Sequence, residues 1–231
     1  MPVEAQRLQL PQAGRNTVYG AALNYRSTLA ALGATLDAKP YGAPPRRPVL
    51  YIKPGNTWIS SGTPIPVPAE IPAVEAGVTL AVLIGRDMHR IAAAAALDYV
   101  AGFTVVNDVT VPHSDFFRPM IRNRCRDGFC VIASALVAPG DAPPLDALQM
   151  RVWVNGRPAC TGSTAGLVRP VATLLADVSA LFTLAAGDLL LVGSAPGAPL
   201  LCVGDHVAVE IDGIGRVENP VIAAPAGAVA A

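Results

Sequence analysis

Twenty-two prolines and 21 glycines are spread along this chain of 231 residues, and they divide its apolar sequence into short segments. Proline removes a backbone N–H donor and biases the preceding residue away from the helical region, so long helices cannot cross these positions. The segments between them are rich in Val, Ile and Leu, which is typical of buried strands. Many short strands with few helices predict a β-rich α+β domain rather than a repeating βαβ sheet.

The expected elements follow from hydrophobic period and turn residues. Strands are expected over 17–23, 49–54, the second half of 74–85 as a central strand, 103–106, 131–137, 148–154, 188–194 and 204–222 as a closing hairpin. Helical patterns cover 24–33, closed by Gly33, then 91–102, and 168–181 with Pro170 in its first turn. Asn155-Gly156 predicts a type I′ hairpin into 157–167.

No Ser-rich linker or composition shift divides the chain, so a single domain is expected over 15–222. Residues 1–14 are expected to form an irregular arm, and the low-complexity residues 223–231 a disordered tail. Formal charge is zero, which excludes a basic face for nucleic acid or a polybasic membrane patch. No uncharged apolar run reaches the roughly 18 residues that a membrane span needs.

A cytoplasmic location is expected because residues 1–14 lack the charged start and apolar run of a secretory signal. The four cysteines lack any CxxC spacing and are expected to remain thiols. The three histidines show no zinc-binding spacing.

Residues 99–129 combine an apolar strand, an acid and a cluster of arginines, and we place the chemistry there. Asp108 follows the strand where it leaves the core, and an acid at a strand end is a candidate site residue. The arginines are Arg118, Arg122, Arg124 and Arg126. Guanidinium groups bind carboxylates in a bidentate geometry, so this cluster suits a ligand rich in carboxylates.

Structural roles are open for the same residues. Asp108 could cap the following turn or pair with an arginine, and the arginines could form a solvated face or a subunit contact. At most two of them can face one ligand from so short a segment. Lys53, at the end of strand 49–54, could be a satisfied structural lysine, and His113 is either a general base or a surface residue.

The ordered set NYRS, YIKP, LAVLIGR, YVAGFTVVNDVT, RCRDGF, VNGRP, AGDLLLVGSAPG and GDHVAVEIDGIG resembles the fumarylacetoacetate hydrolase family over about residues 17–222. Within the family, NDVTVPHSDFFRPMIRNRCRDGF is most similar to the N-terminal half or subunit of the isomerase/decarboxylase type of 4-hydroxyphenylacetate (homoprotocatechuate) degradation. The resemblance implies a mixed β-sheet roll or sandwich with a few flanking helices. It also implies Mg²⁺ or Mn²⁺ chelated by a 2-oxo or 2-hydroxy di- or tricarboxylate, because the metal stabilises an enolate.

The chain departs from the family pattern at the metal and at the base. Asp108 matches one metal ligand, but the two glutamates of the ExE motif fall on Gly77 and Thr79. Glu75 is displaced by about 7 Å along a strand, which makes it a poor substitute ligand. The general-base histidine and its glutamate fall on Thr28 and Ala31. Metal binding is therefore expected to be weak or absent.

The resemblance leaves Lys53, Arg124 and Arg126 as predicted catalytic residues, with Arg118, Arg122 and Ser194 predicted to bind substrate. One hypothesis is a 2-hydroxyhepta-2,4-diene-1,7-dioate isomerase and 5-oxopent-3-ene-1,2,5-tricarboxylate decarboxylase subunit. A second is a non-catalytic subunit that pairs with a metal-bearing paralogue, and a third is a simple dicarboxylate-binding module. The resemblance implies a homodimer, or a heteromer with a paralogue of the same fold.

Overall fold

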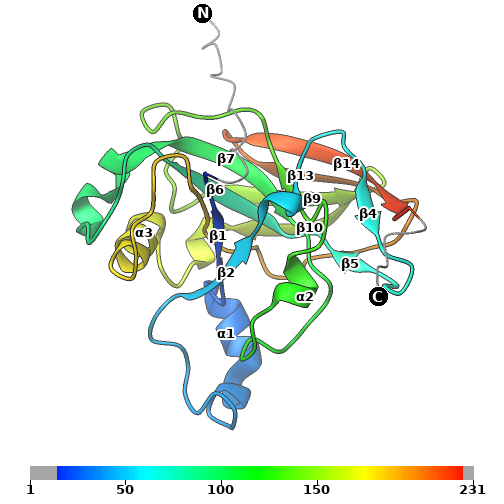
Figure 1. Ribbon diagram of the computed structural model, residues 1–231, viewed down its shortest axis with the longest axis horizontal. Helices are drawn as coiled ribbons and strands as arrows, with labels where there is room; N and C mark the ends of the chain where they lie inside the picture. The colour runs from blue at the N-terminus through cyan, green and yellow to red at the C-terminus, as the bar shows by residue number, and fades with distance from the viewer. Residues whose placement is uncertain (1–14, 226–231) are drawn as a thin grey trace, which may run out of the picture.

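Seven strands form a curled sheet that dominates the computed structural model, which describes residues 15–225 (Figure 1). In sheet order they are β2 (Val49–Lys53), β1 (Val18–Ala22), β11 (Leu189–Leu191), β6 (Val78–Ile84), β7 (Val100–Asp108), β8 (Cys130–Ile132) and β3 (Trp58–Ser60). The edge strands β2 and β3 are nearly consecutive in the chain, joined through Pro54 and the 3₁₀ helix η2 (Gly55–Thr57). The sheet therefore curls until the end of one edge meets the other.

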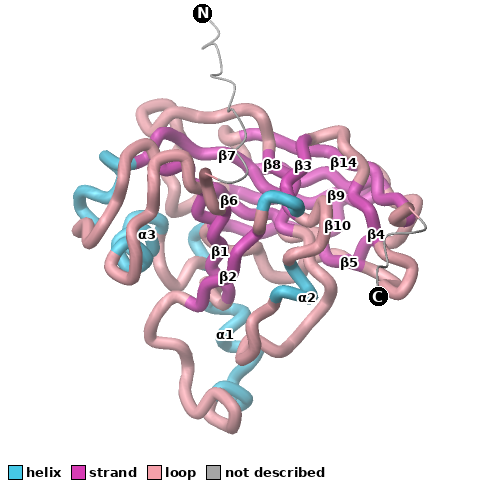
Figure 2. Tube along the Cα trace, viewed as in Figure 1, coloured by secondary structure: helices cyan, strands magenta, loops and turns pink. Residues whose placement is uncertain are grey.

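A second sheet of five strands packs on the first, and the two share one apolar core (Figure 2). Its order is β10 (Arg157–Ser163), β9 (Gln149–Val154), β13 (His206–Ile211), β14 (Gly215–Ala223) and β4 (Ile65–Val67). Core side chains alternate along these strands, as Val207, Val209 and Ile211 do on β13. A third, two-stranded sheet pairs β5 (Val74–Glu75) with β12 (Leu200–Leu201).

The helices are few and lie outside the sheets (Figure 2). Besides η2, they are α1 (Arg26–Leu32), α2 (Ile121–Arg124), α3 (Val171–Ser179) and the 3₁₀ helices η1 (Gly33–Leu36), η3 (Ala93–Tyr99) and η4 (Thr164–Gly166). None of the helices within residues 15–225 is long and apolar enough to cross a membrane. The predicted β-rich α+β class, with a mixed-sheet roll and a few flanking helices, is confirmed.

Several local predictions are also confirmed. Strand β6 lies in the middle of the seven-stranded sheet, α1 ends at Gly33, and β13 and β14 form the closing hairpin. Asn155 and Gly156 both have positive φ, 53° and 74°, as a type I′ turn between β9 and β10 requires. All four cysteines are free thiols.

Three local predictions need correction. The strand expected over 131–137 is shorter, since β8 ends at Ile132 and, further along, Phe103 and Val137 pair only as an isolated bridge, while the Thr104 hydroxyl donates to the Ala135 carbonyl oxygen at 2.7 Å. The helix expected over 91–102 is the 3₁₀ helix η3, which leads directly into β7. Pro170 precedes α3 as its N-cap residue instead of standing in its first turn.

Two predicted segments lie wholly or partly outside the described residues. The arm over 1–14 is outside them, as are residues 226–231 of the predicted tail. The first residue of that tail, Ala223, ends β14 and pairs with Val67 of β4.

Candidate active site

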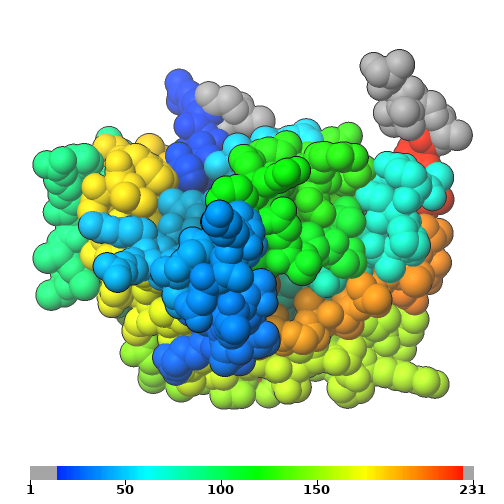
Figure 3. Space-filling view, turned by 90° about the horizontal axis from the view of Figure 1, so that it is seen from below, coloured from blue at the N-terminus to red at the C-terminus, as the bar shows by residue number. Residues whose placement is uncertain are grey.

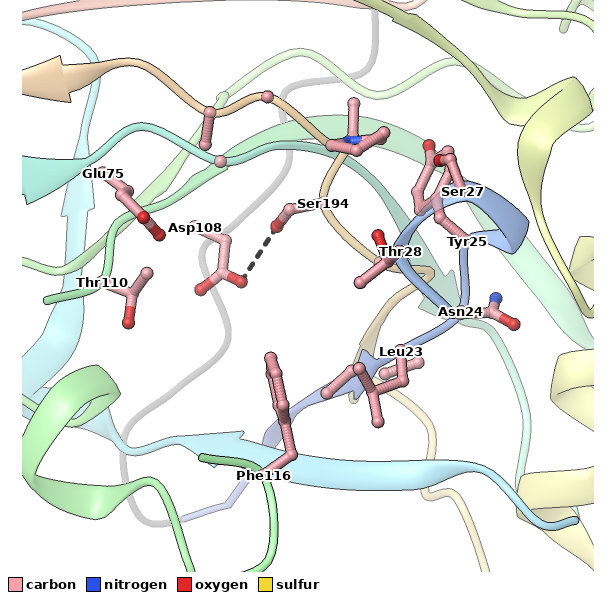
Figure 4. Close-up of a pocket in the computed structure, with 18 of the residues that line it drawn as sticks. Leu23, Asn24, Tyr25, Ser27, Thr28, Glu75, Asp108, Thr110, Phe116 and Ser194 are labelled. Atoms are coloured by element: carbon pink, nitrogen blue, oxygen red, sulfur yellow. Dashed lines mark hydrogen bonds between the residues drawn. The ribbon is translucent and has the colours of Figure 1, made fainter. Parts of the chain in front are cut away.

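Asp108 is the last residue of β7, and its carboxylate is the centre of a buried charge cluster. Lys53 Nζ lies 2.8 Å from Oδ1, and Arg124 Nη1 donates to Oδ2 at 2.7 Å. The hydroxyl of Tyr51 donates to the same Oδ2, and that of Ser194 does so at 3.2 Å (Figure 4). Since Asp108 is only 1% exposed, these four side chains account for the interactions of its carboxylate.

The cluster keeps Asp108 ionised. Burial opposes the charge, but the cations of Lys53 and Arg124 and the hydrogen bonds to the carboxylate outweigh it and hold the pKa of Asp108 at about 2, below its usual 3.8. Burial and the neighbouring Asp108 charge raise the pKa of the Tyr51 phenol well above its usual range. Tyr51 is therefore a neutral hydrogen-bond donor at pH 7.

This pKa predicts a loss of stability in acid. Because the pKa of Asp108 is lower in the folded chain than in the unfolded one, its contribution is complete above about pH 4 and is lost as the pH falls through 2. We expect Asp108 to account for about 2 kcal/mol of the free energy of unfolding over that interval. Urea denaturation from pH 5 to pH 2 would measure it. An Asp108→Asn variant that loses as much stability as the parent over this range would contradict the assignment.

Lys53, the last residue of the edge strand β2, bonds to the chain just after β7 and just before β8. Its ammonium lies 2.6 Å from the carbonyl oxygen of Val109 and 2.8 Å from that of Phe129, in addition to its ion pair with Asp108. The side chain is fully buried and does not line the cavity beside the cluster. Any contribution of Lys53 to catalysis would therefore act through the Asp108 carboxylate.

Tyr51 fits this cluster because Gly20 lies opposite it. The two residues are paired across β1 and β2, and a Cβ added at Gly20 would lie 2.1 Å from the Tyr51 ring. The guanidinium of Arg124 stacks over the Tyr51 ring, with Cζ 4.2 Å from the ring centroid. Tyr51 was missed from sequence, although it lies two residues before Lys53 and so on the same strand face.

A cavity of about 340 Å³ opens beside the cluster. Glu75, Asp108 and Thr110 lie on one side of it, and Ser27 and Thr28 of α1 face them (Figure 4). Two segments distant in sequence lie side by side on the face seen in Figure 3, the blue segment after α1 and the green segment before α2, and Phe116 of the second lines the cavity. The Tyr41 hydroxyl accepts a hydrogen bond from the Phe116 N–H at 2.9 Å and ties them together.

Of the four clustered arginines, only Arg124 lines the cavity. Arg118 and Arg122 are exposed, and Arg126 forms a surface ion pair with Glu70 at 3.1 Å. Ser194 lines the cavity, as do Thr28 and Ala31, the positions at which the resemblance implies a general-base histidine and its glutamate. The ring nitrogens of His113 contact the Val111 carbonyl oxygen and Met120 Sδ, and the imidazole does not line the cavity.

The fold and the cavity define a class, that of β-rich α+β proteins with a cavity beside a buried charge cluster where a central strand of a curled sheet ends. The sequence model of the family described as fumarylacetoacetate (FAA) hydrolase C-terminal matches residues 17–222, so the chain belongs to the fumarylacetoacetate hydrolase family. The predicted resemblance is confirmed.

Three relatives indicate where in the family the chain falls. It is 38% identical over 208 residues to an Escherichia coli 4-hydroxyphenylacetate degradation bifunctional isomerase/decarboxylase, covering 90% of this chain and 47% of the relative. A Mycobacterium smegmatis 5-carboxymethyl-2-hydroxymuconate delta-isomerase superposes with a TM-score of 0.78 at 28% identity, covering 94% and 82% of the two chains. A Mycobacterium marinum 2-hydroxyhepta-2,4-diene-1,7-dioate isomerase superposes with a TM-score of 0.75 at 28% identity. The match covers 90% of this chain and 75% of that one. The chain spans about half the length of the curated relative.

The divalent metal of the family does not fit the residues present. A maleylpyruvate hydrolase of this fold, 22% identical, has been solved with manganese(II) and pyruvate. Here a Cβ at Gly77 would lie 2.6 Å from the Asp108 carbonyl oxygen and 2.7 Å from Ser194 Oγ, so no glutamate can stand there without displacing backbone. Residues 15–225 contain no group of three acidic, His or Cys side chains placed to hold a metal. Asp108 already has four partners, two of them cationic.

Proposed function

We propose that the chain binds a 2-oxo or 2-hydroxy di- or tricarboxylate in this cavity and isomerises it, as a subunit of an isomerase/decarboxylase in 4-hydroxyphenylacetate catabolism. The observation that supports this most directly is the state of Arg124. Within the described chain its guanidinium donates only through Nη1, to Asp108, and its buried Nε has no partner. An arginine with unused donors beside a cavity is suited to bind a substrate carboxylate.

The charges of the cluster support the same proposal. Lys53 and Arg124 bring two positive charges to the single negative charge of Asp108, so the cluster itself carries one net positive charge beside the cavity, which the Glu75 carboxyl also lines. The Tyr51 and Ser194 hydroxyls and Thr110 add polar groups around it. Such a site stabilises negative charge that develops on an enolate oxygen without requiring a metal.

Removing the guanidinium should weaken binding of a dicarboxylate. We expect Arg124→Gln to raise the Kd for heptanedioate about 30-fold, because a hydrogen bond between charged groups contributes about 2 kcal/mol. Isothermal titration calorimetry would measure it, with circular dichroism to establish that the variant is folded. Arg157→Gln, an exposed arginine in the β9–β10 hairpin, is the matched control. Equal affinities for Arg124→Gln and the parent chain would refute the proposed site.

A second candidate function is supported by the closed position at Gly77. If Asp108 cannot complete a metal site, the chain could bind the dicarboxylate without turnover and pair with a metal-bearing paralogue of the same fold. Heptanedioate binding without isomerisation of 2-hydroxyhepta-2,4-diene-1,7-dioate would favour this candidate. Turnover by the chain after dialysis against EDTA would favour the first.

The proposal includes an assembly and a location. We infer a homodimer, or a heteromer with a same-fold paralogue, since the curated relative is about twice the length that this chain matches. The four free thiols are consistent with a reducing compartment such as the cytoplasm. Sedimentation of the chain alone and mixed with a candidate partner would test the assembly.

A further inference from the structure

Glu75 presents to the cavity a carboxyl group that no described residue hydrogen-bonds. Its main chain is fixed, since its N–H donates to the Thr110 carbonyl oxygen at 2.8 Å and its own carbonyl accepts from the Thr110 N–H at 3.2 Å. On the other side, β5 pairs with β12 through Leu200. The side chain is half-buried and points into the cavity (Figure 4). Among the described residues its carboxyl forms no hydrogen bond or ion pair.

No other group that lines the cavity is equally free to move a proton. The Asp108 carboxylate has four partners and a pKa of about 2, which makes it a weak base. The Tyr51 hydroxyl donates its proton to Asp108, and the Tyr25 hydroxyl donates to Met150 Sδ. Arg124 does not give up its proton in proteins. Thr28 and Ala31 replace the family's histidine and glutamate, and neither can serve as a base.

We propose that Glu75 is the proton-transfer residue of this site. The inference rests on the proposed isomerase function and assigns it a residue. For 2-hydroxyhepta-2,4-diene-1,7-dioate, the Glu75 carboxyl gives its proton to C5 while the C2 hydroxyl proton leaves to water. The O–H pair forms C2=O, the C2–C3 π pair forms C3=C4, and the C4–C5 π pair forms the new C5–H bond. Glu75 then regains a proton from water, so the reaction is an isomerisation without net proton uptake.

The surroundings of Glu75 shift the equilibrium of its carboxyl toward the acid form. Burial raises the pKa of its carboxyl above the usual 4.5, against the opposing influence of the Arg124 charge. The other titratable groups that line the cavity are Asp108 from β7, Arg124 from α2, Tyr51 from β2 and Tyr25 before α1, while residues 193–198 contribute none. A raised pKa brings a carboxylic acid closer to the operating pH, which favours general acid catalysis.

The test compares Glu75→Gln and Glu75→Asp with the parent chain. We expect Glu75→Gln to lower kcat for 2-hydroxyhepta-2,4-diene-1,7-dioate at least 100-fold, the range typical of a general acid or base, with Kd for heptanedioate changed less than threefold. Deuterium incorporation at C5 in D₂O, followed by NMR, should fall in parallel. Glu75→Asp keeps a carboxyl and should recover part of the rate. Glu218→Gln, on the exposed face of β14, is the control.

The outcomes separate this inference from the function on which it rests. Glu75→Gln turnover above one tenth of the parent value would overturn the role of Glu75 and leave the isomerase proposal intact. A parent chain that binds heptanedioate but incorporates no deuterium would also overturn it, and would leave the second candidate function. A parent chain that binds no heptanedioate would refute the proposed site itself.

Discussion

Replacing Asp108 by asparagine should lower the free energy of unfolding by about 3–5 kcal/mol, because it leaves the fully buried Lys53 without a counter-charge. Breaking one member of a buried ion pair costs far more than the pair contributes, since the remaining charge is desolvated and unpaired. Urea denaturation at pH 7, read by circular dichroism, would measure the change. Asp146→Asn, at an exposed acid, should change stability by less than about 0.5 kcal/mol.

The double variant Asp108→Asn with Lys53→Met provides the internal check. Replacing both charges by neutral groups removes the unpaired ammonium, so the double variant should recover at least about 1 kcal/mol relative to Asp108→Asn alone. If the stability losses of Asp108→Asn and Lys53→Met, each measured alone, instead added fully in the double variant, Lys53 and Asp108 would not be coupled. The ion pair could not then be the reason for the loss.

Restoring the family's acidic motif with Gly77→Glu and Thr79→Glu should not restore metal binding. A side chain at position 77 meets the Asp108 carbonyl oxygen and Ser194 Oγ at less than 3 Å, and Thr79 is fully buried within β6. We expect the double variant to lose about 3 kcal/mol or more of stability from overpacking and buried charge. Elemental analysis after dialysis against Mn²⁺ should find far less than one equivalent per chain.

The parent chain, treated in the same way, is the baseline for that measurement. Stoichiometric Mn²⁺ retained by the parent would contradict the argument from the Asp108 partners. Stoichiometric Mn²⁺ in the double variant alone would show that the backbone at Gly77 can move aside.

Sequence patterns predicted the strands well because they are short, apolar and bounded by Pro and Gly. The turn at Asn155 could be predicted because type I′ geometry requires two positive φ angles, which this dipeptide adopts readily. The strand over 131–137 was overestimated, since hydrophobic period does not reveal that the regular ladder ends at Ile132 and returns as an isolated bridge at Val137.

The candidate site was predicted only in part. Asp108 and Arg124 come together as the cluster of acid and arginines suggested, but spacing along the chain could not separate Arg124 from Arg118 and Arg122. Those side chains differ in burial, which depends on how α2 packs against β2. Glu75 was considered only as a metal ligand, and its place in the cavity depends on β5 leaving the plane of β6 to pair with β12.

The pairing of β1 with β11 has a consequence for the order of events during synthesis on the ribosome. Val18 lies beside Leu189, so that edge of β1 has no neighbour until 171 further residues have been synthesised, 136 of them after Lys53 at the end of β2. An unpaired strand edge can associate with other chains, and contacts so distant in sequence form late. We therefore expect the nascent chain to depend on chaperones until β11 docks and brings β1 and β2 against the rest of the curled sheet.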